Sequence, residues 1–71
     1  HLKTKVMEKR VVTINEYQFG SSKVKEQIEI ENGLFRPVVF SDGELIAEWD
    51  RKQCMNDAKA CLDEFDIESE D

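Results

Sequence analysis

Two cysteines and one histidine are the residues of this chain best suited to nucleophilic or metal chemistry. A catalytic cysteine or serine needs a base beside it, and the single histidine is the first residue, His1. Structural zinc needs four cysteine or histidine ligands, and Cys54, Cys61 and His1 are too few. The sequence also has no glycine-rich phosphate-binding loop. We therefore expect no catalytic site, no metal site and no cofactor.

Cys54 and Cys61 fall seven residues apart in a segment that we predict to be helical. Seven residues rise roughly 10.5 Å along a helix, which exceeds the Cα separation of roughly 7 Å that a disulfide allows. We therefore expect two free thiols, packed as small apolar residues of the helix and slow to react in the native state. Free thiols indicate a reducing compartment, so the predicted location is the cytoplasm. Intermolecular disulfides in a secreted dimer are the alternative.

Carboxylates are the commonest groups that could act as acids or bases, but with 16 of them in 71 residues accidental pairs are expected. The net charge of -6 comes entirely from residues 63–71, because acids and bases cancel in the rest of the chain. The simplest interpretation is a helix that ends near Phe65, followed by a mobile, solubilising tail at residues 66–71. In the alternatives the segment docks on a basic partner or folds back on the basic first third of the chain. The candidate partner-binding residues are then Asp63, Glu64, Asp66, Ile67, Glu68, Glu70 and Asp71, with Ile67 as the apolar anchor.

Basic residues dominate the first 25 positions, whereas acids dominate residues 26–50. The basic residues give a second candidate surface, which would bind nucleic acid: Lys3, Lys5, Lys9, Arg10, Lys23 and Lys25. The simpler interpretation is that adjacent strands pair opposite charges across a solvated face.

The charged residues of the first half of the chain are predicted to lie on strands. Residues 5–19 and 23–31 are rich in β-branched and aromatic residues and have no helical period. Residues 23–31 alternate cleanly, with only Glu26 on the apolar face. In residues 5–19 the alternation changes phase, which predicts either a bulge near Asn15 or burial on both faces. Asn32-Gly33 predicts a tight hairpin into a third strand at residues 34–40. Pro37 should lie at a bulge, at a strand end or where its nitrogen faces solvent.

After a turn at residues 41–43, a fourth strand at residues 44–49 leads into a helix. Asp50 is the predicted N-cap, with Gln53 completing a capping box. The apolar stripe of the helix is predicted to comprise Cys54, Ala58, Cys61, Leu62 and Phe65. We expect Trp49 to fill the junction between sheet and helix, the alternative being an exposed binding anchor.

These elements predict an α+β fold, an antiparallel β-meander of three to four strands with one C-terminal amphipathic helix packed on the sheet. Residues 1–65 form a single small domain, and residues 66–71 form the acidic tail. No apolar run approaches the roughly 18 residues of a membrane span. In such a meander residues 5–19 and 44–49 are the outer strands, so a homodimer through an edge strand is one expected partnership.

The predicted function is that of a small non-catalytic protein-binding module, a regulator or inhibitor of the kind that phages and mobile elements encode. The reasons are the missing catalytic groups and the bipolar charge. Two alternatives are a nucleic-acid-binding domain that uses the basic first third, and an acidic mimic of nucleic acid.

Overall fold

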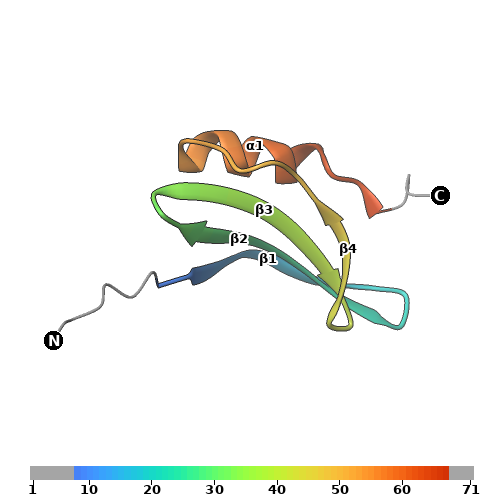
Figure 1. Ribbon diagram of the computed structural model, residues 1–71. Coiled ribbons are helices and arrows are strands. Elements are labelled where there is room, and N and C mark those ends of the chain that lie inside the picture. The colour runs from blue at the N-terminus through green and yellow to red at the C-terminus, as the bar shows by residue number, and fades with distance from the viewer. Residues whose placement is uncertain (1–7, 68–71) are drawn as a thin grey trace, which may run out of the picture.

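Residues 8–67, the part of the chain that the computed structural model describes, form four strands followed by one helix. The elements are β1 (Arg10–Phe19), β2 (Ser22–Glu31), β3 (Leu34–Ser41), β4 (Glu44–Glu48) and α1 (Met55–Glu64). Consecutive strands pair antiparallel in the order β1-β2-β3-β4, and α1 packs on β2 and β3 (Figure 1). The predicted α+β meander with a C-terminal helix is confirmed. No helix within residues 8–67 has both the length and the apolar character that crossing a membrane demands.

Two-residue turns connect β2 to β3 and β3 to β4, and both residues of each turn adopt positive φ. The values are 56° and 74° at Asn32 and Gly33, and 52° and 84° at Asp42 and Gly43. Only glycine, asparagine and aspartate reach this region readily, and two consecutive positive values match the twist of the strands they join. The hairpin predicted at Asn32-Gly33 is confirmed.

A bulge in β1 decides which of its side chains face the helix. The pairing with β2 shifts between Thr13 and Asn15, so Ile14 is an extra residue in the strand. Val12 lies opposite Ile28 and Tyr17 opposite Val24, both on the face that α1 covers. The predicted bulge near Asn15 is confirmed. Within the described residues the strand begins at Arg10, later than the predicted residue 5, because its partner β2 ends just beyond the pair Arg10–Ile30.

Pro37 lies in the middle of β3 and is buried, which its missing N–H would normally prevent. Its carbonyl accepts a hydrogen bond from the Trp49 N–H at 3.2 Å, so its nitrogen faces the same neighbouring segment. That segment bulges here: Val38 pairs with Glu48, but Phe35 pairs with Lys52. One of the predicted environments for Pro37, a bulge, is therefore correct.

The helix begins later than predicted, at Met55, with Cys54 as its N-cap in extended backbone and without a side-chain capping bond. The predicted cap at Asp50 is wrong because the chain continues along β3 as far as the bridge between Lys52 and Phe35. Phe35 donates to the Lys52 carbonyl at 2.8 Å and accepts from the Lys52 N–H at 2.6 Å. These two bonds satisfy backbone groups that β4 is too short to reach, and a helix starting at residue 51 would lose them. The helix ends as predicted, with Phe65 as C-cap.

The core lies between α1 and the face of the sheet that we call the inner face. Its fully buried side chains are Val24 and Ile28 of β2, Val39 of β3 and Ala58 and Leu62 of α1. Side chains alternate along a strand, so every second residue of β2 and β3 faces the other way, on what we call the outer face. These residues are Lys25, Gln27, Glu29 and Glu31 of β2, and Leu34, Arg36, Val38 and Phe40 of β3. No element formed by residues 8–67 covers the outer face (Figure 1).

Candidate functional site

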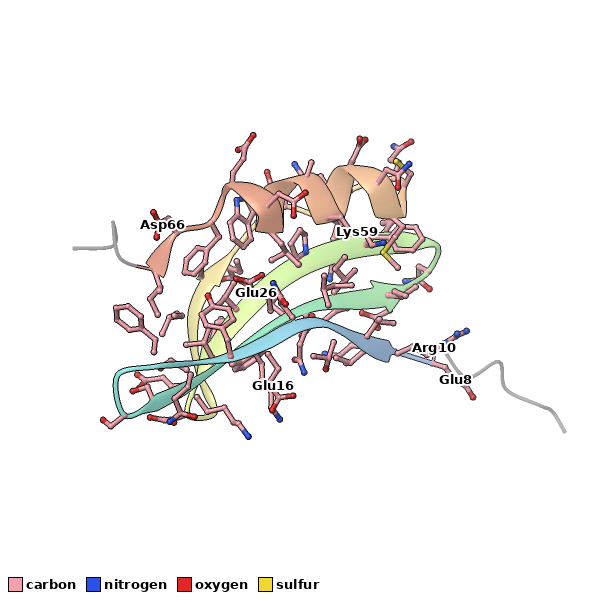
Figure 2. All side chains as sticks on the ribbon, turned by 180° about the vertical axis from the view of Figure 1, so that it is seen from behind. Glu8, Arg10, Glu16, Glu26, Lys59 and Asp66 are labelled. Atoms are coloured by element: carbon pink, nitrogen blue, oxygen red, sulfur yellow. The ribbon has the colours of Figure 1, made fainter. Side chains whose placement is uncertain are left out.

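The acidic segment is described only as far as Ile67, so Glu68, Glu70 and Asp71 lie outside the described residues. Asp63 and Glu64 are exposed in the last turn of α1. Asp66, labelled in Figure 2, is exposed just beyond the helix. Ile67 is half-buried and packs against the core. Its side chain therefore contributes to the stability of this domain, and its role as an anchor for a partner stays a prediction.

The packing of Ile67 extends the folded part of the chain two residues beyond the predicted boundary at Phe65. A chain that ends at Phe65 is expected to lose about 1 kcal/mol of stability, a fraction of the value for burying a whole isoleucine side chain. A chain that ends at Ile67 keeps all of this packing and is the matched control. Urea unfolding followed by Trp49 fluorescence measures both, and equal stabilities of the two truncated chains would contradict the assignment.

The basic first third is partly neutralised by neighbouring acids. Lys9 pairs with Glu29 at 3.8 Å, and Lys23 pairs with Glu16 at 3.2 Å. Both pairs join β2 to β1 or to the residue just before it, which confirms the predicted pairing of opposite charges across strands. Of the other predicted basic residues, Arg10 and Lys25 are exposed, while Lys3 and Lys5 lie outside the described residues.

The outer face carries apolar side chains, a feature that the sequence reasoning did not use. Phe40 pairs with Leu45 of β4, and Val38 pairs with Glu48. The apolar outer-face residues are Val11, Leu34, Val38, Phe40 and Leu45. Leu45 is 43% exposed and Val11 is 49% exposed. The signal in the sequence was the nearly continuous apolar run of β3, which is typical of a strand covered on both faces.

Ion pairs and hydrogen bonds surround these apolar groups. Arg36 Nη1 donates to Glu48 Oε1 at 3.1 Å, and Gln27 Nε2 donates to Thr13 Oγ1 at 3.1 Å. The Arg36 Nε is buried without a hydrogen-bond partner among the described residues. Within residues 8–67, Lys25 and Glu31 belong to no ion pair of the outer face.

A hollow of about 500 Å³ lies at one end of the outer face. Its lining consists of Lys23, Lys25, Gln27, Phe40, Asp42 and Gly43. Asp42 is already engaged, because its Oδ1 accepts the backbone N–H of Lys23 at 2.9 Å. Phe40 supplies an apolar wall and Lys25 a cation, so the hollow suits an apolar group that has a carboxylate beside it.

On the inner face Glu26 is a carboxylate in an apolar setting, with only 6% of its surface exposed. The Tyr17 hydroxyl donates to Glu26 Oε2 at 2.9 Å. Burial, this hydrogen bond and the negative charges of Glu26 and Asp66 raise the pKa of Tyr17 to about 12. In Figure 2, Glu26 lies between the sheet and α1, whereas Glu16 points away on the other side of the sheet. The pair therefore belongs to the core and not to the outer face.

Trp49 is half-buried against the core at the junction of sheet and helix. Its ring meets that of Phe65 edge to face, with centroids 6.1 Å apart and planes at 84°. The predicted junction role is confirmed, so Trp49 is not an exposed binding anchor.

The two thiols differ in exposure, which corrects the predicted apolar stripe. Cys54 is exposed at the N-cap, and Met55 takes its place against the core because the helix starts later than predicted. Cys61 is half-buried. Titration with Ellman's reagent is expected to show one fast thiol and one slow thiol in the native state, and two fast thiols in denaturant. Replacing Cys54 with serine should remove the fast phase, and loss of the slow phase instead would contradict the helix register.

Comparison of the chain with protein-family models, with curated proteins and with solved structures finds no match in any of the three.

Proposed function

We propose that this chain is a small, non-catalytic protein-binding module that acts as a regulator or inhibitor through the outer face of its sheet. The observation that carries the proposal is the two-sided apolar character of β3. Phe35, Pro37 and Val39 lie on the inner face, while Leu34, Val38 and Phe40 lie on the outer face. A sheet face that meets water normally alternates to polar residues, and α1 covers the inner face alone.

The arrangement of apolar and charged groups on the outer face supports this proposal. Phe40 and Leu45 form an apolar patch on this face, and the ion pairs of Lys23 with Glu16 and of Arg36 with Glu48 lie beside this patch. Protein interfaces generally combine an apolar centre, depleted in charge, with a polar rim. Val38 is only 2% exposed, so the open apolar surface comes from the residues beside it.

The ion pairs of Lys9 with Glu29 and of Lys23 with Glu16 count against the nucleic-acid alternative. Lys9 and Lys23 would have to exchange Glu29 and Glu16 for phosphate groups, and those carboxylates would then repel the phosphate backbone. The chain as a whole carries a net charge of -6. Placement in the cytoplasm is part of the proposal and is supported by the free thiols of Cys54 and Cys61.

Site-specific photo-crosslinking tests the proposal. A benzophenone amino acid replaces Leu45 on the outer face in one protein and Lys59 on α1 in a control, and both proteins are irradiated in host extract. We expect a discrete protein adduct at position 45 that is absent at position 59 and is lost when Phe40→Glu is added. Adducts of equal yield at both positions would contradict the proposal.

Retention on heparin and on duplex DNA separates the two classes of function. A protein-binding module is expected to flow through both columns at moderate salt. Retention that falls steeply with salt concentration would favour the nucleic-acid alternative and overturn the proposal.

A further inference from the structure

We infer that the outer face is self-complementary and that the protein it fits is a second copy of this chain, packed face to face. The inference rests on the proposed function, in that it names the partner of the same outer face. It is carried by the order of charged and apolar residues along β2 and β3.

Ile28 and Pro37 are register partners in the middle of β2 and β3. Their side chains lie on the inner face, but their level along the strands marks the centre of the outer face. Three residues to one side of this centre, Lys25 lies beside Phe40. Three residues to the other side, Glu31 lies beside Leu34. The two ends of the outer face thus carry opposite charges on β2 and apolar side chains on β3.

Consider two copies stacked with their outer faces together. A two-fold axis that lies between the two sheets, parallel to them, perpendicular to the strands and level with this centre, places each end of one outer face over the opposite end of the other. Lys25 of each copy then faces Glu31 of the other, and Phe40 of each copy faces Leu34 of the other. Both contacts occur twice, because an isologous interface repeats every contact. Lys25 and Glu31 have no ion pair on the outer face within residues 8–67, so each is available for this contact.

The neighbouring strand β1 also carries opposite charges at the two ends of the outer face. Glu16 is the register partner of Lys25, and Lys9 precedes Arg10, the partner of Ile30, so Lys9 lies beside Glu31. The two-fold axis therefore brings Glu16 of one copy over Lys9 of the other. Stacked sheets cross at roughly 30°, so the alignment is closest at β2 and β3 and looser at β1.

The hollow on the outer face has an occupant in this arrangement. Lys25 and Phe40 line it, and these are the residues that the second copy covers with Glu31 and Leu34. Glu31 supplies the carboxylate and Leu34 the apolar group to which the hollow is suited. Burial of these side chains against one another removes apolar surface from water in both copies at once.

Association through an edge strand is the competing arrangement. The edge strand β1 contains the bulge at Ile14, and β4 shifts register between Val39 and Phe40 of its partner β3. A bulged edge cannot pair in register along its whole length, because the extra residue interrupts the regular spacing of the backbone N–H and C=O groups along the strand. Edge pairing also leaves Lys25 and Glu31 outside the interface, and this difference makes the two arrangements separable.

Charge reversal at these two positions tests the inference in the purified full chain. Sedimentation velocity from micromolar to submillimolar concentration is expected to show a monomer and dimer in exchange. Lys25→Glu and Glu31→Lys each create two like-charge contacts and should raise the dissociation constant at least about tenfold, which corresponds to about 1.4 kcal/mol. The double variant restores both pairs with the charges exchanged and should return the dissociation constant to near that of the parent protein.

Lys59→Glu on α1 makes the same change of charge away from the outer face and is the matched control, expected to dimerise normally. Far-ultraviolet circular dichroism confirms that each variant is folded. A concentration-independent monomer overturns the inference. A dimer that neither single variant weakens, or that the double variant fails to restore, overturns it as well and points to an edge strand.

The outcomes separate this inference from the proposed function. A monomer whose position 45 still crosslinks to a different protein leaves the proposed function standing and removes the self-pairing. A dimer that responds to charge as expected, but captures no other protein, supports the self-pairing and contradicts a role as regulator of another protein.

Discussion

Ile28→Ala is expected to remove most of the stability of this domain. Ile28 has no exposed surface and lies in the middle of β2, between Val12 of β1 and Pro37 of β3, in the core cluster that α1 covers. Truncating a buried isoleucine to alanine costs about 2 to 5 kcal/mol, because transfer free energy is lost and a cavity remains. A domain this small has a total stability of about the same size.

Urea unfolding followed by the fluorescence of Trp49, the only tryptophan, measures the effect. Val11→Ala is the matched control on the outer face, where the side chain is 49% exposed, and it is expected to change stability by less than about 0.5 kcal/mol. Similar losses in the two variants would show that the core does not lie between α1 and the inner face.

Tyr17→Phe is expected to destabilise the fold by about 1 to 3 kcal/mol at neutral pH, because it removes the hydrogen bond to the buried carboxylate of Glu26. The pH dependence follows from the pKa of Tyr17, which is raised from 10.0 to about 12 in the folded protein. The unfolded chain loses the phenolic proton first. The contribution of the hydroxyl is therefore fully present below pH 10 and decreases as the pH rises toward 12.

Titration of the tyrosinate absorbance tests this directly, since Tyr17 is the only tyrosine of the chain. We expect a midpoint well above that of a free phenol, and a stability difference between parent and Tyr17→Phe that shrinks at high pH. Glu26→Gln keeps an acceptor but removes the charge, so it should move the midpoint back toward its ordinary value. An ordinary midpoint in the parent protein would contradict the buried pair.

Several features of the fold follow from interactions between residues that are close in the sequence. The alternation of β2 predicted which of its side chains face the core, including Glu26. The positive φ values of Asn32 and Gly33 follow from residue type, because few other residues adopt that backbone without strain. The phase change near Asn15 predicted either a bulge or burial on both faces, and the pairing of β1 with β2 contains the bulge. The end of α1 near Phe65, its C-cap, was predicted from the acids that follow it.

Contacts between distant residues decided the rest. The backbone bonds between Phe35 and Lys52 hold the chain along β3 as far as Lys52, which moves the start of α1 to Met55 and leaves Cys54 exposed. The packing of Ile67 against the core depends on where the end of α1 places it.

The candidate site shows the same division. The sequence by itself determined that the first third is basic, that the end is acidic and that β3 is apolar on both sides. Only the tertiary structure decided that Lys9 and Lys23 face Glu29 and Glu16, because ion-pair partners are set by strand register. It also decided that no other element formed by residues 8–67 covers the outer side of β3, because α1, ten residues long, lies over the inner face of the sheet.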